Sequence, residues 1–123
     1  MEKAFCTRHV VFHLCAAGLW EALFEVVRDV EWLLARAQMD PLEVVLDLEH
    51  AASFSSPHQS TVRLMGQALR MDLDELRHDH RSVPTQLVAR LLGHESRGVQ
   101  DLLEELREWE GPPQGWSELE RQQ

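Results

Sequence analysis

The chain has 123 residues, of which 44% are hydrophobic, and these values are typical of one folded globular domain. It carries 21 acidic and 12 basic residues, and its formal net charge of −9 disfavours general binding to nucleic acid or to anionic membrane surfaces. No signal peptide or membrane-length apolar run is evident, so we expect a cytoplasmic protein whose two cysteines are reduced.

Helix start and stop signals divide the first 109 residues, whereas strand signals are nearly absent. The signals are a left-handed glycine, capping side chains and prolines at first helical positions: Gly18, Asp29, Asp40-Pro41, Ser60, Asp72, Pro84, Gly93 and Ser96. They predict helices over residues 3–17, 19–28, 29–38, 41–53, 61–71, 73–80, 84–93 and 97–109.

This pattern predicts an all-α fold, an antiparallel array of about eight short helices that is either superhelical and solenoid-like or a compact bundle. No strict repeat period is visible. We assign residues 1–109 to the helical domain and residues 110–123, which are punctuated by Pro and Gly, to a tail or linker.

The first predicted helix carries the best candidates for metal or thiol chemistry. His9 and His13 are four residues apart and share a helix face with Cys6, a spacing that allows a metal site. The site lacks the glutamate of a metalloprotease helix, and no further ligand is identifiable, so packed or surface histidines are the preferred interpretation. A small metal-binding or thiol-dependent protein centred on Cys6, His9 and His13, with Cys15 nearby, is the alternative function.

Other catalytic and ligand-binding patterns are missing. The chain has no glycine-rich phosphate loop, Lys3 is its only lysine, and its serines resemble loop and cap residues. We therefore predict no enzyme activity, no cofactor and no small-molecule substrate. A helix-turn-helix regulator built on residues 73–80 and 84–93 is a weaker alternative, because the second of these helices offers only Gln86 and Arg90 for DNA contacts.

Large apolar side chains point instead to protein contacts. The first helix is apolar over more than half of its circumference, which favours a protein partner or self-association through an exposed helix face. Trp32 and Trp20 fall on apolar helix faces as core or inter-helix anchors, whereas two further tryptophans flank the Pro-Pro tail. The candidate interaction residues are Phe5, Phe12, Trp20, Trp109 and Trp116.

Several segments, in order, resemble the helical domain of apoptotic protease-activating factor and its bacterial relatives. They are His13-Leu14, Ala17-Gly18, Trp20–Leu23, Asp29, Trp32-Leu33, Ala35-Arg36, Leu46–Leu48, Arg63-Leu64, Gln67–Arg70, Gln86-Leu87, Arg90–Gly93, Val99–Leu103 and Pro112–Gly115. The likeness covers residues 5–115, although Leu48 stands where that family often has an aromatic residue after the aspartate.

The resemblance implies a non-enzymatic arm. In those signalling ATPases the domain connects nucleotide-binding and winged-helix modules to a WD40 propeller. The residues of ATP hydrolysis are absent from this chain, so that activity is not implied. The expected function is that of a helical scaffold or interaction module that mediates protein–protein contacts.

Overall fold

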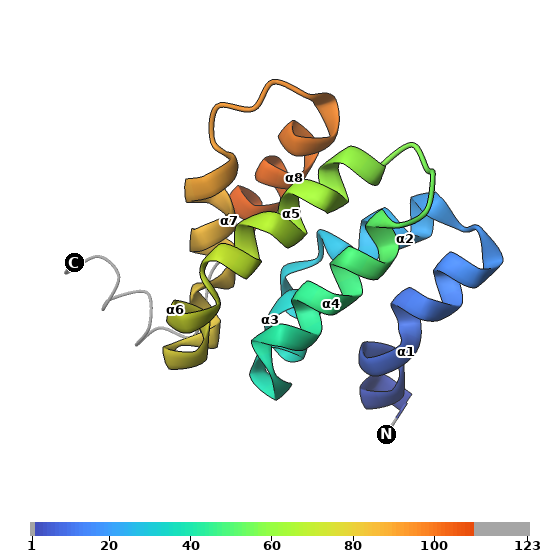
Figure 1. Cartoon of the computed structure of the whole chain (residues 1–123), viewed down its shortest axis with the longest axis horizontal. Helices are drawn as coiled ribbons and strands as arrows, with labels where there is room; N and C mark the ends of the chain where they lie inside the picture. Colours follow the sequence, from blue (N-terminus) through green and yellow to red (C-terminus); the bar gives the residue numbers. More distant parts are fainter. Residues whose placement is uncertain (1, 110–123) are drawn as a thin grey trace.

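Eight α-helices and one short 3-10 helix follow one another in the computed structural model, which describes residues 2–109 and the side chains of residues 9–109 (Figure 1). They are α1 (Glu2–Ala17), α2 (Trp20–Val27), α3 (Val30–Met39), α4 (Pro41–Ala52), α5 (Gln59–Met71), α6 (Leu73–His78), η1 (His80–Ser82), α7 (Val83–Leu91) and α8 (Arg97–Glu108). The predicted all-α fold is confirmed, and of its two forms the helices adopt the compact one. The predicted tail, residues 110–123, lies outside the described residues.

The pair α4 and α5 forms the middle of the molecule. Figure 1 shows the two helices running antiparallel, with α1 at one edge of the assembly and α6 at the opposite edge. The core between the helices is almost entirely aliphatic. Its largest fully buried side chains include Leu23, Leu33, Leu48, Met65, Leu69, Leu76, Leu87, Leu102 and Leu103.

Gly18 ends α1 in the manner expected from the sequence. Its φ of +68° lies in the left-handed region, where a residue without a Cβ is favoured. The amide of Gly18 donates to the carbonyl of Cys15, and the amide of Leu19 donates to that of Leu14. These two bonds form a Schellman motif, which satisfies the last carbonyls of α1 and turns the chain into α2.

Three predicted capping side chains occupy their expected places. The carboxylate of Asp29 accepts from the amide of Glu31, and that of Asp40 accepts from Leu42, at 2.8 and 3.0 Å. The hydroxyl of Ser96 accepts from the amide of Val99 at 3.4 Å. Asp40 is both the C-cap residue of α3 and the N-cap residue of α4, so this single residue joins the two helices.

The cap of α5 differs from the sequence prediction. The helix begins at Gln59, with His58 at the N-cap position and no side-chain cap, so Ser60 lies inside the first turn. The turn before the helix supplies the reason, because the hydroxyl of Ser56 accepts from the amide of His58. The Gln59 side chain also donates to the carbonyl of Ala52, at 3.0 Å.

The end of α6 is also earlier than predicted. Asp79 is extended, with φ −149° and ψ 95°, and its carboxylate accepts from the amide of Arg81. This contact starts the 3-10 helix η1, so α6 stops at His78. Asp72 stands at the N-cap position of α6 but makes no side-chain cap bond, because its carboxylate is bound to Arg90.

Candidate functional site

Four rings from separate parts of the chain form a continuous line of contacts, which we call the aromatic–histidine row: Phe12, His50, Phe54 and Trp20. Phe12 of α1 lies against His50 of α4, with ring centroids 4.2 Å apart. His50 meets Phe54 edge to face at 5.3 Å, and Phe54 in turn contacts Trp20 of α2 at 5.7 Å. The row therefore joins the first two helices to the end of α4.

A second set of contacts fastens α2 to the turn before α5. The ring of His58 is stacked on that of Phe24, with centroids 4.1 Å apart and planes 8° from parallel. His58 Nε2 also lies 2.8 Å from a carboxylate oxygen of Glu21, and the guanidinium carbon of Arg28 is 5.0 Å from the Phe24 centroid. The turn is thereby held against α2.

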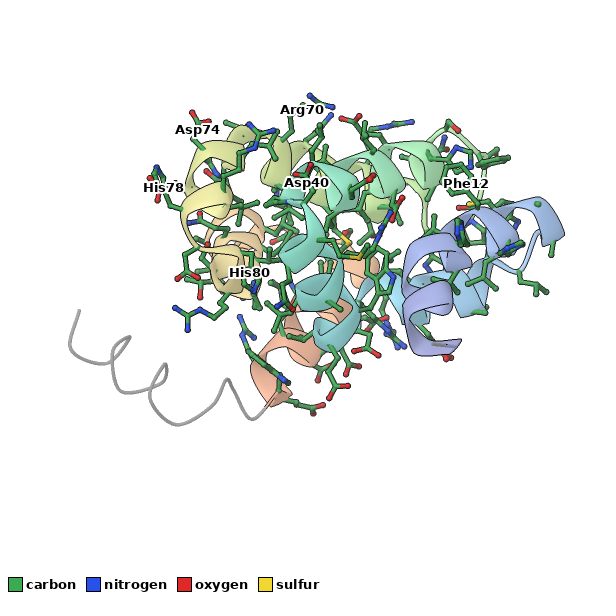
Figure 2. All side chains as sticks on the ribbon, turned by 90° about the horizontal axis from the view of Figure 1, so that it is seen from below. Phe12, Asp40, Arg70, Asp74, His78 and His80 are labelled. Atoms are coloured by element: carbon green, nitrogen blue, oxygen red, sulfur yellow. The ribbon has the colours of Figure 1, made fainter. Side chains whose placement is uncertain are left out.

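The outer end of the row is exposed. Half of the Phe12 side chain is accessible to solvent, at 50%, although the ring is held against His50. Leu46, one helical turn before His50 on the same face of α4, is 45% exposed. Figure 2 shows Phe12 at the opposite end of the molecule from His78 and His80.

The other predicted interaction residues have different surroundings. Trp20 and Trp109 are partly buried and pack against the core, and Trp109 stands at the end of α8. Trp32 is buried, as predicted for a core anchor. Phe5 and Trp116 lie outside the side chains that the structure describes.

A buried ion pair, which the sequence analysis did not predict, connects α3 to α4. Arg36 Nε donates to a carboxylate oxygen of Asp47 at 2.9 Å, and the two side chains are only 5% and 4% exposed. Glu43 approaches the same guanidinium at 3.8 Å from the surface. Burial raises the pKa of Asp47 above its ordinary value, and the hydrogen bond and charge of Arg36 oppose that effect.

Cys15 of α1 is a buried free thiol. Burial, together with the nearby charge of Asp47, raises the pKa of the Cys15 thiol. A nucleophilic cysteine needs the thiolate, which a raised pKa disfavours. The environment of Cys15 therefore works against thiol chemistry.

The structure describes the side chains of two of the three candidate metal ligands, His9 and His13. The rings of His9 and His13 are in edge-to-face contact, with centroids 6.3 Å apart, so the two imidazoles share one face of α1 as expected. Among the described side chains no group of three His, Cys, Asp or Glu residues is placed to hold a metal ion. The side chain of Cys6 lies outside that set.

One residue of the helix-turn-helix alternative has a structural partner. Arg90 donates through Nε and Nη2 to both carboxylate oxygens of Asp72, at 3.0 and 2.7 Å. Asp72 is 7% exposed, so this two-point contact is anchored on a buried group. The Arg90 guanidinium is therefore engaged in joining α7 to the start of α6.

An open groove of about 460 Å³ lies between the first turn of α3 and the last turn of α8. Acidic side chains and an indole dominate its lining, which consists of Asp29, Val30, Glu31, Glu105, Glu108 and Trp109. A smaller open groove of about 270 Å³ lies between α4 and α5. Within residues 2–109, no helix has both the length and the apolar character needed to cross a membrane.

Comparisons of the chain with protein-family models, with curated proteins and with solved structures found no match. The candidate site therefore rests on the geometry of the chain itself. Its best-defined exposed feature is the outer end of the aromatic–histidine row.

Proposed function

We propose that this protein is a non-enzymatic interaction module that binds a protein partner through the outward face of α1, with Phe12 as the central contact. The observation that carries the proposal is the position of Phe12, which is half exposed and yet held with its ring centroid 4.2 Å from that of His50. Aromatic side chains are enriched at protein interfaces. A ring already held in place loses less conformational freedom on binding than a mobile one, so Phe12 is suited to this role.

The place of α1 in the fold supports the same proposal. The helix lies at an edge of the assembly, where one of its sides has no neighbouring helix (Figure 1). Terminal helices of stacked arrays are normally covered or polar on their outer side. Among the described side chains of α1, the apolar residues Phe12, Ala16 and Ala17 are exposed beside the exposed histidines His9 and His13.

We extend the proposal to the role that the family resemblance implies, a stiff arm within or beside a signalling ATPase. A helical bundle with short connections and a continuous aliphatic core suits a rigid spacer. In this role α1 would contact a neighbouring domain or subunit, and the partner would be a nucleotide-binding or propeller-containing protein.

Site-specific photo-crosslinking in cells tests the docking proposal. A benzophenone amino acid is placed at Leu46, next to the row, and in a control protein at Glu104, which is exposed on α8. We expect a discrete cross-linked protein at position 46 only, and its loss when Phe12→Ala is added. Circular dichroism of each variant checks that the fold is retained.

The outcome also separates the kinds of partner. A cross-link between two copies of the chain, matched by concentration-dependent sedimentation, would assign self-association. Equal cross-linking at positions 46 and 104, or persistence of the product after Phe12→Ala, would show that Phe12 is not the central contact with the partner. A strictly monomeric protein with neither cross-link nor apolar-dye binding would overturn the proposal.

The competing proposal is a metal centre on α1. It is supported by the contact between the His9 and His13 rings on one helix face, with Cys6 three residues before His9 in the sequence. Elemental analysis of purified protein decides the matter. A stoichiometric transition metal that is lost in His9→Ala would establish it, whereas metal-free protein after incubation with zinc would exclude it.

A further inference from the structure

The open groove between α4 and α5 adjoins the surface that carries Phe12. Leu46, His50 and Ser53 are spaced i, i+4 and i+7 on α4, so they share one face of that helix. His50 contacts Phe12 of α1, and Ser53 lines the groove towards α5. Figure 1 shows the same order of helices, with α4 lying between α1 and α5. The Phe12 surface and the groove therefore meet on one face of α4.

The walls of the groove are mostly polar. They consist of Glu49, Ala52 and Ser53 from α4 and of Arg63 and Gln67 from α5. Arg63 and Gln67 are four residues apart, so they lie one above the other on the outward side of α5, and both are exposed. A side chain of a docked partner can therefore reach these two groups from solvent.

The charges beside the groove leave one guanidinium without a counter-ion. The carboxylate of Glu49 accepts from Nε and Nη2 of Arg70, at 2.6 and 2.9 Å, so its charge is compensated within the chain. Arg63 makes no hydrogen bond or ion pair with any of the described residues. Two arginines against one glutamate give this region a formal charge of +1, in a chain whose net charge is −9.

The hydrogen-bonding groups that remain available in the groove fit a carboxylate. A guanidinium has five N–H donors and no acceptor, and the side-chain amide of Gln67 adds two more donors. Within the described part of the chain, Gln67 also has no hydrogen-bond partner. Ser53 already donates its hydroxyl proton to the carbonyl of His50, at 2.6 Å. Arginine donors in a fixed planar fork bind carboxylate and phosphate groups.

The carboxylate of Glu49 decides between these two anions. It lies in the wall of the groove and repels any anion that enters. A phosphate monoester carries about 1.5 to 2 negative charges near neutral pH, whereas a carboxylate carries one. The groove therefore favours the singly charged group.

We infer that the partner docked on Phe12 also places the carboxylate of an aspartate or glutamate side chain in the α4–α5 groove, where Arg63 and Gln67 donate to it. The inference rests on the proposed function and adds the chemistry of the partner: an apolar residue against Phe12 and Leu46 and, across α4, an acidic residue in the groove. Because the chain as a whole repels anions, this contact gives specificity and does not steer the encounter.

Charge reversal at Arg63 tests the inference in the full chain that carries the benzophenone amino acid at position 46. Arg63→Glu places a carboxylate opposite that of the partner, so we expect the yield of the cross-linked product to fall several-fold or more. Arg77→Glu makes the same change at an exposed position of α6, at the opposite edge of the assembly, and should leave the yield unchanged. Circular dichroism checks that both variants are folded.

A charge exchange then identifies the acidic residue of the partner. Mass spectrometry of the product locates the cross-linked segment, and each aspartate or glutamate of that segment is replaced in turn by lysine. We expect one of these lysine variants to lose binding to the natural chain and to regain it with Arg63→Glu. Such a recovery requires opposite charges at the two positions, so a folding defect in either protein cannot produce it.

The outcomes separate this inference from the docking role of Phe12. Equal yields from Arg63→Glu and Arg77→Glu, or a cross-linked segment without an acidic residue, would overturn the inference and leave the role of Phe12 intact. Binding that requires a phosphorylated residue in the segment would also overturn it. A product that depends on Arg63 but persists after Phe12→Ala would leave the groove contact standing and overturn the role of Phe12 alone. The absence of any product at position 46 would remove both.

Discussion

Arg36 and Asp47 place opposite charges on the inward faces of two successive helices. In α3 the arginine lies between Leu33 and Ala37, which are both buried. In α4 the aspartate lies beside the buried Leu48. An aliphatic pair of similar size would need no hydrogen bond, whereas these two side chains satisfy each other only in one register of α3 against α4. The pair is thus suited to specifying helix register more than to adding stability.

Substitution of this pair one residue at a time, and then together, tests its contribution. Arg36→Met or Asp47→Leu alone leaves an unpaired buried charge and is expected to lower the free energy of unfolding by about 3–5 kcal/mol. The double variant is expected to be neutral or more stable than the natural protein by about 1–4 kcal/mol. Urea denaturation followed by circular dichroism provides the measurement.

An exposed ion pair gives the control for this experiment. Arg97 lies 3.8 Å from Asp101 with its side chain 93% exposed, so Arg97→Met is expected to change stability little. A double variant of the buried pair that is as unstable as the worse single variant would contradict the interpretation. In that case the charges would be essential for packing itself.

Glu49 contributes to the stability of the fold in a pH-dependent way, and the direction of its pKa shift gives the sign of that contribution. Its hydrogen bonds with Arg70, at 2.6 and 2.9 Å, lower the pKa of this carboxyl below the ordinary 4.5. A carboxyl with a lowered pKa in the folded state stabilises the protein above its unfolded pKa, and this contribution is lost as the pH falls through the folded pKa. Both side chains are nearly half exposed, so the effect is small.

The free energies of unfolding of Glu49→Gln and of the natural protein are compared between about pH 7 and about pH 3. This range spans the ordinary pKa of a glutamate side chain, so the comparison measures the contribution of the ion pair. We expect the variant to be slightly less stable near neutrality and the difference to vanish at the acid end. Glu104→Gln, an exposed glutamate outside the ion pairs of the described residues, should show no such change. A difference that grows towards acid would reverse the assigned sign.

At the scale of elements, the close contact between α5 and α8 depends on a missing side chain. Gly98 lies in the first turn of α8, and a Cβ added there would overlap the hydroxyl of Thr61 and approach its Cβ to 3.2 Å. Thr61 is buried and cannot move away freely. The glycine therefore sets how closely the two helices approach.

The variant Gly98→Ala tests this contact. In an open helix the change would stabilise the protein by about 1 kcal/mol, because alanine has the higher helix propensity. Here we expect a loss of about 1–3 kcal/mol from overpacking, measured by urea denaturation. Gly66→Ala, where the nearest side-chain atom would be 3.4 Å away, should cost less. A stabilised Gly98→Ala protein would show that the contact is loose.

The elements could be predicted largely because their ends are encoded locally. Gly18, Asp29, Asp40 and Ser96 act on amides or carbonyls within a few residues, and their helices end within two residues of the predicted positions. The predicted cap at Ser60 is wrong, because a turn closed by other side chains starts the helix at Gln59.

The candidate site could be predicted only in part. The apolar character of the first helix indicated an exposed surface, and Phe12 is indeed half exposed. The partners of Phe12 and the Arg36–Asp47 pair depend on how helices pack across the bundle, which short-range patterns do not encode. Opposite charges on the apolar stripes of adjacent helices were the available signal for the pair.

For the whole molecule, the formal charge of −9 is the main long-range feature. Excess like charge destabilises a compact state, and salt screens it over a distance that falls from about 30 Å at 0.01 M to about 8 Å at 0.15 M ionic strength. We therefore expect the melting temperature to rise with sodium chloride over this range. Differential scanning calorimetry would record the change.

The rise of the melting temperature with salt should become smaller when the net negative charge of the protein is reduced. Removing two acidic groups with Glu104→Gln and Glu108→Gln, both at exposed positions of α8, is expected to flatten the rise. A melting temperature that falls with salt would instead show that attractive ion pairs outweigh the general repulsion.

The single-residue junction at Asp40 has a consequence for how this chain can be lengthened. Since Asp40 closes α3 and opens α4, an inserted residue would rotate one helix against the other and separate Arg36 from Asp47. The connection at residues 92–96 is exposed throughout and contains Gly93 with φ +100°. We therefore expect an epitope or fluorescent reporter inserted there to leave the fold intact, which circular dichroism of the fusion would check.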